Sequence, residues 1–223
     1  MDITPEQIRW IAQGMIILIL SIAVHEFGHA LVATRLGDQL PHQQGRVTLN
    51  PIAHADPIGT LLLPFLGLAF GAGVLGWGKP VQVRPERFSR RFTMLTGHML
   101  VALAGPMMNV FLGTFIAALH VTLIATGVIA PGHEIHKGLA FAAGLNFTLF
   151  FFNMLPVPPL DGGAVARRAI PTGWRPGFEQ FSVYGPFVLL AILMIPKIGQ
   201  IITIPASFVT QNLYRGLFAL AGI

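Results

Sequence analysis

One pentad of the sequence has the residue types and spacing of a metal site: His25-Glu26-Phe27-Gly28-His29. On a helix, two histidines four residues apart lie about 40° apart around the axis and roughly 6 Å apart along it, so both imidazoles can bind one zinc ion. Glu26 follows the first histidine, where its carboxylate can act as general base toward a water molecule at the metal. We therefore expect one Zn2+ per chain at this pentad.

Two histidines do not complete a catalytic zinc site, which usually has three protein ligands. Because the chain has no cysteine, the third ligand must be a histidine, an aspartate or a glutamate. The candidates in or next to apolar sequence are Asp161, His54, Asp56, His98, His120 and Glu134 with its neighbours His133 and His136. Asp161 is favoured, since prolines before it stop a regular helix and glycines after it allow close backbone approach. The simpler interpretation of Asp161 is a turn residue.

The pentad lies in a long apolar stretch, residues 8–36, and the whole composition is that of a membrane protein. Of 223 residues, 53% are hydrophobic and 10% are charged, against about 25% charged in soluble domains. Ionisable side chains are costly inside a membrane helix and indicate a functional site there. The composition predicts an all-α polytopic membrane protein in contact with the lipid bilayer, and its 25 Gly and 17 Pro indicate kinked or broken spans.

The net charge of +5 does not indicate nucleic-acid binding. Lys and Arg residues cluster in loops between apolar runs, which is typical of the positive-inside pattern of membrane proteins. We expect no nucleic acid among the partners.

The apolar runs predict about five to six transmembrane helices with a small re-entrant or β-hairpin element near the site. The expected helices are residues 5–36, 93–128, 138–155, 178–195 and 198–223. Residues 60–77 are short and interrupted by proline and glycine, so they either span the membrane or re-enter it. We expect the polar residues 38–59, in which 46–49 could form a strand, to fold over the metal. The chain is expected to be one domain, 1–223, with a catalytic core at about 5–170 and C-terminal helices at 178–223.

The membrane topology can be predicted if the pentad and Asp161 bind one metal. The helix ends that carry them must then lie on the same side of the membrane. A re-entrant segment at 60–77 satisfies this condition. It also places eleven of the 14 Lys and Arg residues, Arg215 among them, on the side of the site, and leaves Arg9, Lys137 and Lys197 on the other. The positive-inside rule then predicts a multi-pass protein of the cell membrane with its site toward the cytoplasm.

Three motifs together resemble the site-2 protease family of intramembrane zinc metalloproteases. They are the pentad in a first span, Gly105-Pro106 with Asn109 in a later one, and the run Asn153-Met154-Leu155-Pro156-Val157-Pro158-Pro159-Leu160-Asp161-Gly162-Gly163. Residues 49–60 and 76–81 resemble the short bacterial branch of that family, which lacks PDZ and CBS domains. The likeness covers most of residues 15–165.

The resemblance implies that His25, His29 and Asp161 bind the zinc and that Glu26 is the catalytic base. It implies an active-site hydrogen bond from Asn153, for instance to a developing oxyanion, although Asn153 could also simply cap the broken helix.

For Asn109 and Gly105 we expect helix packing, and for residues 76–83 a strand or hairpin that pairs with an unwound substrate. The implied activity is hydrolysis of peptide bonds in or near transmembrane segments of membrane-protein substrates, as in regulated intramembrane proteolysis. No oligomeric state is implied. A non-catalytic zinc-binding membrane module, transporter or chaperone is the alternative, but a purely structural site needs no carboxylate between its ligands.

Overall fold

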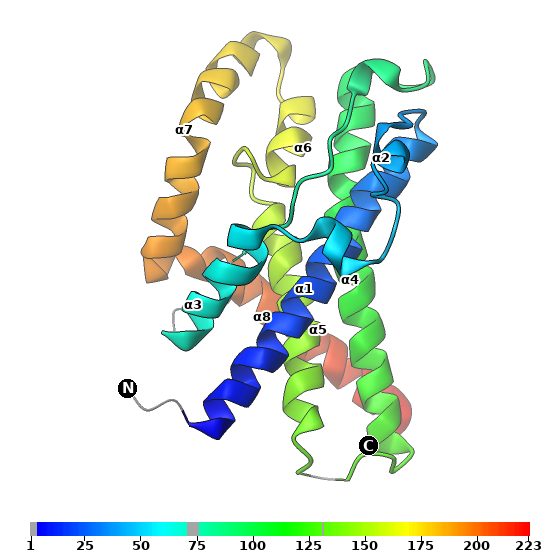
Figure 1. Ribbon diagram of the computed structural model, residues 1–223, viewed down its shortest axis with the longest axis vertical. Helices are drawn as coiled ribbons and strands as arrows, with labels where there is room; N and C mark the ends of the chain where they lie inside the picture. Colours follow the sequence, from blue (N-terminus) through cyan, green and yellow to red (C-terminus); the bar gives the residue numbers. More distant parts are fainter. Residues whose placement is uncertain (1–3, 71–75, 131) are drawn as a thin grey trace.

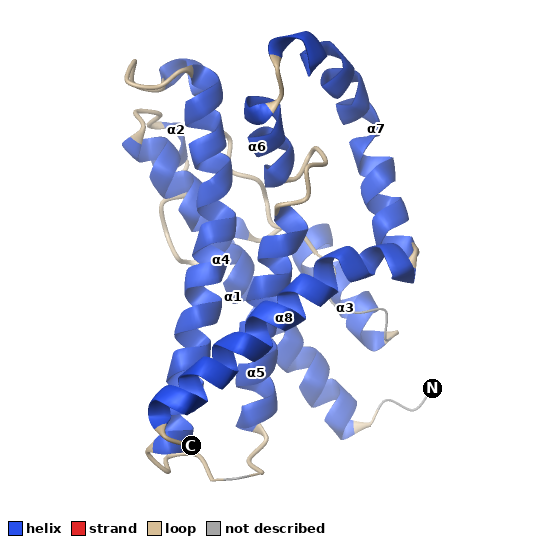
Figure 2. Cartoon of the chain, turned by 180° about the vertical axis from the view of Figure 1, so that it is seen from behind, coloured by secondary structure: helices blue, strands red, loops and turns tan. Residues whose placement is uncertain are grey.

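The computed structural model describes residues 4–70, 76–130 and 132–223 (Figure 1). Helices and loops make up these ranges, with no strand among them (Figure 2), so the predicted all-α fold is confirmed. The α-helices are α1 (Pro5–Arg35), α2 (Leu40–Gln43), α3 (Leu63–Ala69), α4 (Met94–Ala125), α5 (Ile135–Asn153), α6 (Asp161–Ala169), α7 (Arg175–Met194) and α8 (Pro196–Ala221).

Helix α1 has strong start and stop signals, and its observed bounds lie within one residue of the expected 5–36. Thr4 caps its first turn, since the Thr4 side chain accepts from the Gln7 amide while the Gln7 side chain accepts from the Thr4 amide. Pro5 occupies the first turn, where no amide hydrogen is required. Gly37 follows the helix with φ +115°, a backbone conformation that favours glycine.

Helices α1, α4 and α5 form the centre of the molecule and lie side by side (Figure 1). Small residues allow the close approach: a Cβ on Gly28 would lie 2.7 Å from the Ala104 carbonyl oxygen, and one on Gly113 would lie 3.2 Å from that of Ala143. These are the three helices that are long and apolar enough to cross a membrane by themselves in the described part of the chain. They correspond to the expected spans 5–36, 93–128 and 138–155.

The expected count of five to six spans is not confirmed. The expected helices 178–195 and 198–223 are present as α7 and α8, but the pair bends by 81° at a short break and would add one span at most. Helix α8 packs against α5 and α4 and crosses in front of them in Figure 2, which shows the molecule from behind.

The segment after Asp56 turns back on itself. A π-helical piece, Pro57–Leu62, continues into α3, and the two contain six and seven residues, which is shorter than the about 20 residues that a span requires. The Trp77 amide donates to the Gly59 carbonyl oxygen at 3.0 Å, so the two ends of this segment lie next to each other. Part of the expected hairpin falls on residues 71–75, outside the described residues. The expected strand at 46–49 is not formed, since residues 47 and 48 make bends and residues 46 and 49 have no regular structure.

One expectation about charge placement was wrong. The Tyr214 hydroxyl lies 2.9 Å from Nδ1 of His120, and His120 lies near the end of α4 that is remote from Met94. Arg215, the neighbour of Tyr214, therefore lies toward the opposite side from the C-terminal end of α1. The side of the pentad keeps ten of the 14 Lys and Arg residues.

Candidate metal centre

The pentad of α1 and the first residue of α6 meet at one point. The Nε2 atoms of His25 and His29 lie 3.0 Å apart, and each lies 3.3 Å from Oδ2 of Asp161. One ligand atom from each of the three residues lies within 4.8 Å of the others. Both histidines are buried and Asp161 is partly buried. The three residues expected to bind zinc are therefore close enough to share one ion.

Asp161 reaches this point because α5 ends early and α6 begins against its broken end. Seven residues rich in proline, 154–160, separate the two helices. A Cβ on Gly162 would overlap the Met154 and Leu155 backbone, and one on Gly163 would lie 2.8 Å from the Pro158 nitrogen. The two glycines thus allow the start of α6 to pack directly on the loop.

Both imidazoles are held from behind by oxygen atoms. Nδ1 of His29 lies 2.7 Å from the Val101 carbonyl oxygen, and Nδ1 of His25 lies 2.6 Å from Oδ1 of Asn109. Because a carbonyl oxygen only accepts, His29 carries its hydrogen on Nδ1 and presents the Nε2 lone pair toward Asp161. A hydrogen bond of this kind is the usual support of a metal-binding histidine.

Gly105 of α4 faces the two rings. A Cβ at this position would overlap the His29 ring and lie 2.8 Å from Cε1 of His25. Gly105 and Asn109, which we expected to serve helix packing alone, are both in contact with the candidate ligands.

The donor set fits zinc. Two imidazoles and one carboxylate are a common ligand set of catalytic zinc sites, which keep a further position for water or substrate. When the two imidazoles are protonated, burial raises the pKa of Asp161, but their hydrogen bonds and positive charge lower it more strongly, so the net shift is downward. Asp161 is therefore an anion at neutral pH, the form that binds a cation.

Glu26 lies beside the cluster and faces the same cavity, whose volume is about 660 Å3. Glu26 is 8% exposed, and its Oε2 accepts a hydrogen bond of 3.2 Å from the Val81 amide. The cavity is also lined by His98, Asn153 and the segment that contains Gly76, Trp77, Gly78, Pro80, Val81 and Val83. A carboxylate, a metal-binding cluster and space for a substrate therefore occur together.

The segment 76–83 is extended, and its backbone amides are bound along one edge only, whereas the amide of Arg84 just after it donates to Oδ2 of Asp38. Its amides donate inward at alternate residues, from Trp77 to Gly59, from Lys79 to His54 and from Val81 to Glu26. Alternation by two residues is the strand pattern, so the amides of Gly78 and Gln82 point the other way. Within the described ranges neither amide has a protein acceptor. The expected strand is thus an extended segment with one edge available.

Asn153 is the last residue of α5 and lines the cavity. Its Nδ2 donates to the Leu149 carbonyl oxygen of the same helix at 2.9 Å. Because an asparagine amide carries two hydrogens, one donor remains for a ligand.

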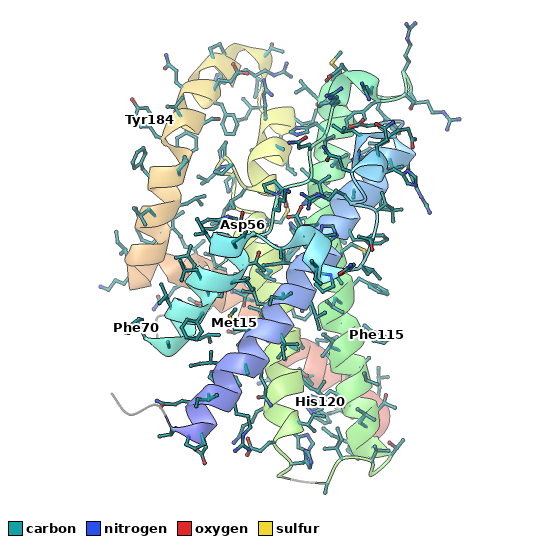
Figure 3. All side chains as sticks on the ribbon, in the orientation of Figure 1. Met15, Asp56, Phe70, Phe115, His120 and Tyr184 are labelled. Atoms are coloured by element: carbon teal, nitrogen blue, oxygen red, sulfur yellow. The ribbon has the colours of Figure 1, made fainter. Side chains whose placement is uncertain are left out.

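The other third-ligand candidates lie elsewhere. Figure 3 shows His120 far from Asp56, and its Nε2 lies 2.9 Å from Nδ1 of His136. His54 is buried with Nε2 bound to the Thr48 carbonyl oxygen, and Asp56 caps the amides of Ile58 and Gly59. His98 lines the cavity but does not belong to the three-residue cluster.

Sequence reasoning missed two residues behind the site, Ser21 and Asn146, which contact Asn109. The available signal was the presence of asparagines within apolar helices, where polar side chains usually have a function.

Comparisons with known proteins agree with the geometry. The sequence model of peptidase family M50 matches residues 123–196, a range that includes Asn153 and Asp161. The chain is 35% identical over 194 residues to the Bacillus subtilis protein named "Putative zinc metalloprotease YwhC", covering 86% of this chain and 84% of the relative. Relatives named Rip2, with the same description, are 30% identical over 184 residues in Mycolicibacterium smegmatis and 36% over 183 in Mycobacterium tuberculosis H37Rv. These two matches cover 82% and 81% of this chain and 66% of each relative. No solved structure matches significantly.

Proposed function

This chain belongs to peptidase family M50, the site-2 protease family, and on that premise we propose that it hydrolyses peptide bonds in or near transmembrane segments of membrane-protein substrates. At the family level it is a zinc metalloprotease, and its apolar helices make it a multi-pass membrane protein. The observation that carries the proposal is the convergence of His25, His29 and Asp161 beside Glu26 at one cavity.

In this proposal His25, His29 and Asp161 hold the single zinc ion. Zinc bound there would act as a Lewis acid that activates water and polarises the substrate carbonyl. Glu26 takes a proton from the water whose oxygen attacks the scissile carbonyl carbon. When the carbon–nitrogen bond breaks, Glu26 gives that proton to the leaving nitrogen, so the carboxylate is regenerated.

Asn153 and the extended segment would handle the substrate. The second amide hydrogen of Asn153 is available to the oxyanion that develops on the attacked carbonyl. The outward edge of residues 76–83 would pair with a locally unwound substrate as an added strand. Unwinding is needed because the backbone hydrogen bonds and side chains of an intact helix shield its carbonyl groups from attack.

The site is proposed to face the cytoplasm of the cell, at the inner face of its membrane. With Arg215 moved to the other side, the expected topology groups ten of the 14 Lys and Arg residues on the side of the site, which the positive-inside rule assigns to the cytoplasm. All candidate site residues fall between His25 and Asp161, which supports a catalytic core at about 5–170 within one domain of residues 1–223.

The test compares purified wild type with Glu26→Gln on a membrane-spanning reporter peptide supplied with zinc. Because the amide of the substituted glutamine cannot accept the proton, cleavage is expected to fall by about 10²- to 10⁴-fold. Zinc content, measured on the same samples, serves as control and is expected to be unchanged. Equal amounts of intact reporter after incubation with the two proteins would refute the proposal.

A further inference from the structure

A buried path of hydrogen bonds runs from His25 to two other helices. Behind His25, the Nδ2 of Asn109 on α4 donates to Oδ1 of Asn146 on α5 at 2.9 Å and to the Ser21 carbonyl oxygen at 3.3 Å. The Nδ2 of Asn146 donates to Oγ of Ser21 at 3.0 Å and to the Ala142 carbonyl oxygen at 2.9 Å. Asn109 and Asn146 are 0% exposed and Ser21 is 1% exposed.

The direction of each bond follows from the groups at the far ends. Backbone carbonyl oxygens only accept, so the Ala142 oxygen requires the Nδ2 of Asn146, and the Ser21 oxygen requires the Nδ2 of Asn109. The Oδ1 of Asn109 is then the atom that faces His25, whose Nδ1 must carry the hydrogen. The lone pair of His25 consequently lies on Nε2, the atom next to Asp161. The carbonyl oxygens of Ser21 and Ala142 therefore fix the orientation of the Asn109 and Asn146 amides. Asn109 in turn selects the His25 tautomer with its hydrogen on Nδ1.

This path is more than the packing of three helices requires. Buried amides are costly unless they are hydrogen-bonded, and between apolar helices a smaller apolar residue would pack without that cost. Both asparagines have partners for their amide nitrogen and oxygen, and the path ends on a candidate metal ligand rather than on a neutral contact.

We propose that Asn146 and Ser21 are positioning residues of the metal site, which act through Asn109 to keep Nε2 of His25 directed at the metal. The proposal rests on the proposed zinc site. It assigns a role to α5, because α5 would support the ligands of α1 from the side opposite to Asp161.

The experiment measures the zinc dissociation constant of the full chain by competition with a fluorescent chelator. Loss of an outer hydrogen bond to a metal-binding histidine weakens binding about 10- to 100-fold, and we expect a loss in this range for Asn146→Leu. Ser21→Ala removes only a hydroxyl and should weaken binding severalfold. The matched control is Thr148→Val on α5, since the Thr148 hydroxyl bonds only the Gly144 carbonyl oxygen of its own helix. Zinc binding by this variant should equal that of wild type.

A double-mutant cycle separates positioning from packing. In an Asn109→Leu background, Asn146→Leu should cause no further loss of zinc affinity, because its effect passes through Asn109. The absorption spectrum of the Co2+-loaded protein should shift in Asn146→Leu and remain unchanged in Thr148→Val.

Wild-type zinc affinity in both Asn146→Leu and Ser21→Ala would overturn the proposal, as would additive losses in the Asn109→Leu background. If Asn146→Leu does not fold, Ser21→Ala decides alone. Tight zinc binding by a wild type that cleaves no reporter would refute the proposed protease function and leave this inference standing.

Discussion

At the scale of single residues, the site depends on how closely other groups approach the two imidazoles. Val101 and Asn109 hold the His29 and His25 rings through Nδ1, and Gly105 leaves room for both rings. The position of each ring is therefore determined by α4 as much as by the pentad itself.

Substitution at Gly105 tests this dependence. Gly105→Ala places a methyl group where the imidazoles lie, so zinc affinity is expected to fall at least about tenfold. The control is Gly144→Ala, because a Cβ there meets no atom within 4 Å. In the control, zinc binding should be unchanged and stability should rise by about 0.5–1 kcal/mol. Chelator competition measures the zinc affinity, and thermal unfolding measures the stability. Unchanged zinc affinity in Gly105→Ala would contradict this description of the site.

The proximity of the pentad to Asp161 could be predicted from motifs, since residue types and spacing are visible within each short run. The contacts of Asn109 and Gly105 could not. They depend on which face of α4 turns toward α1, and a helix that is apolar all round has no periodicity to indicate that face.

At the scale of elements, the extended segment 76–83 connects the polar loop to the cavity. Gly78 permits its close approach to α1, since a Cβ there would lie 2.6 Å from Cγ2 of Ile22 and 3.3 Å from Cγ of Glu26. The bounds of the long helices were predictable from apolar runs with proline and glycine at their ends, but α6 was not among the expected helices. The extended segment was only partly predictable. Its amides donate to Gly59, His54 and Glu26, and these acceptors lie far from the segment in the sequence.

Gln82→Pro tests the proposed pairing with substrate. It removes an outward amide without touching the inward bonds, and one hydrogen bond contributes about 0.5–1.5 kcal/mol. Reporter cleavage should therefore fall about two- to tenfold, mainly through a higher KM, while zinc content stays constant. Gln82→Ala keeps the amide but loses the side-chain bond to Gln44, so it controls for that contact. Equal KM values for the two variants would argue against pairing at this edge.

At the scale of the whole molecule, the helix bundle has two ends, and a membrane crossed by α1, α4 and α5 would separate them. The C-terminal ends of α1 and α5 lie on the side of the site, and the turn between α4 and α5 lies on the other (Figure 1). The parity of the spans stays a prediction from charge. The break between α7 and α8 was expected from the sequence, but its angle of 81° was not, and Arg215 was misplaced for that reason.

Labelling of single cysteines tests this arrangement, and the cysteine-free chain gives no background. Ser89 and His133 are both exposed and lie at opposite ends of α4. In intact cells, a membrane-impermeant maleimide should label His133→Cys and leave Ser89→Cys unlabelled. Permeabilised cells, in which both variants should react, provide the control. The reverse pattern in intact cells would place the site on the outer side.

The central claim is that α1 and the start of α6 hold one metal together, and the zinc-to-protein ratio of purified Asp161→Ala tests it most directly. Glu26→Gln is the matched comparison, because it also removes a carboxylate from the cavity but leaves all three proposed ligands in place. We predict about one zinc per chain in wild type and Glu26→Gln, and a large loss in Asp161→Ala. A full complement of zinc in Asp161→Ala would contradict the claim.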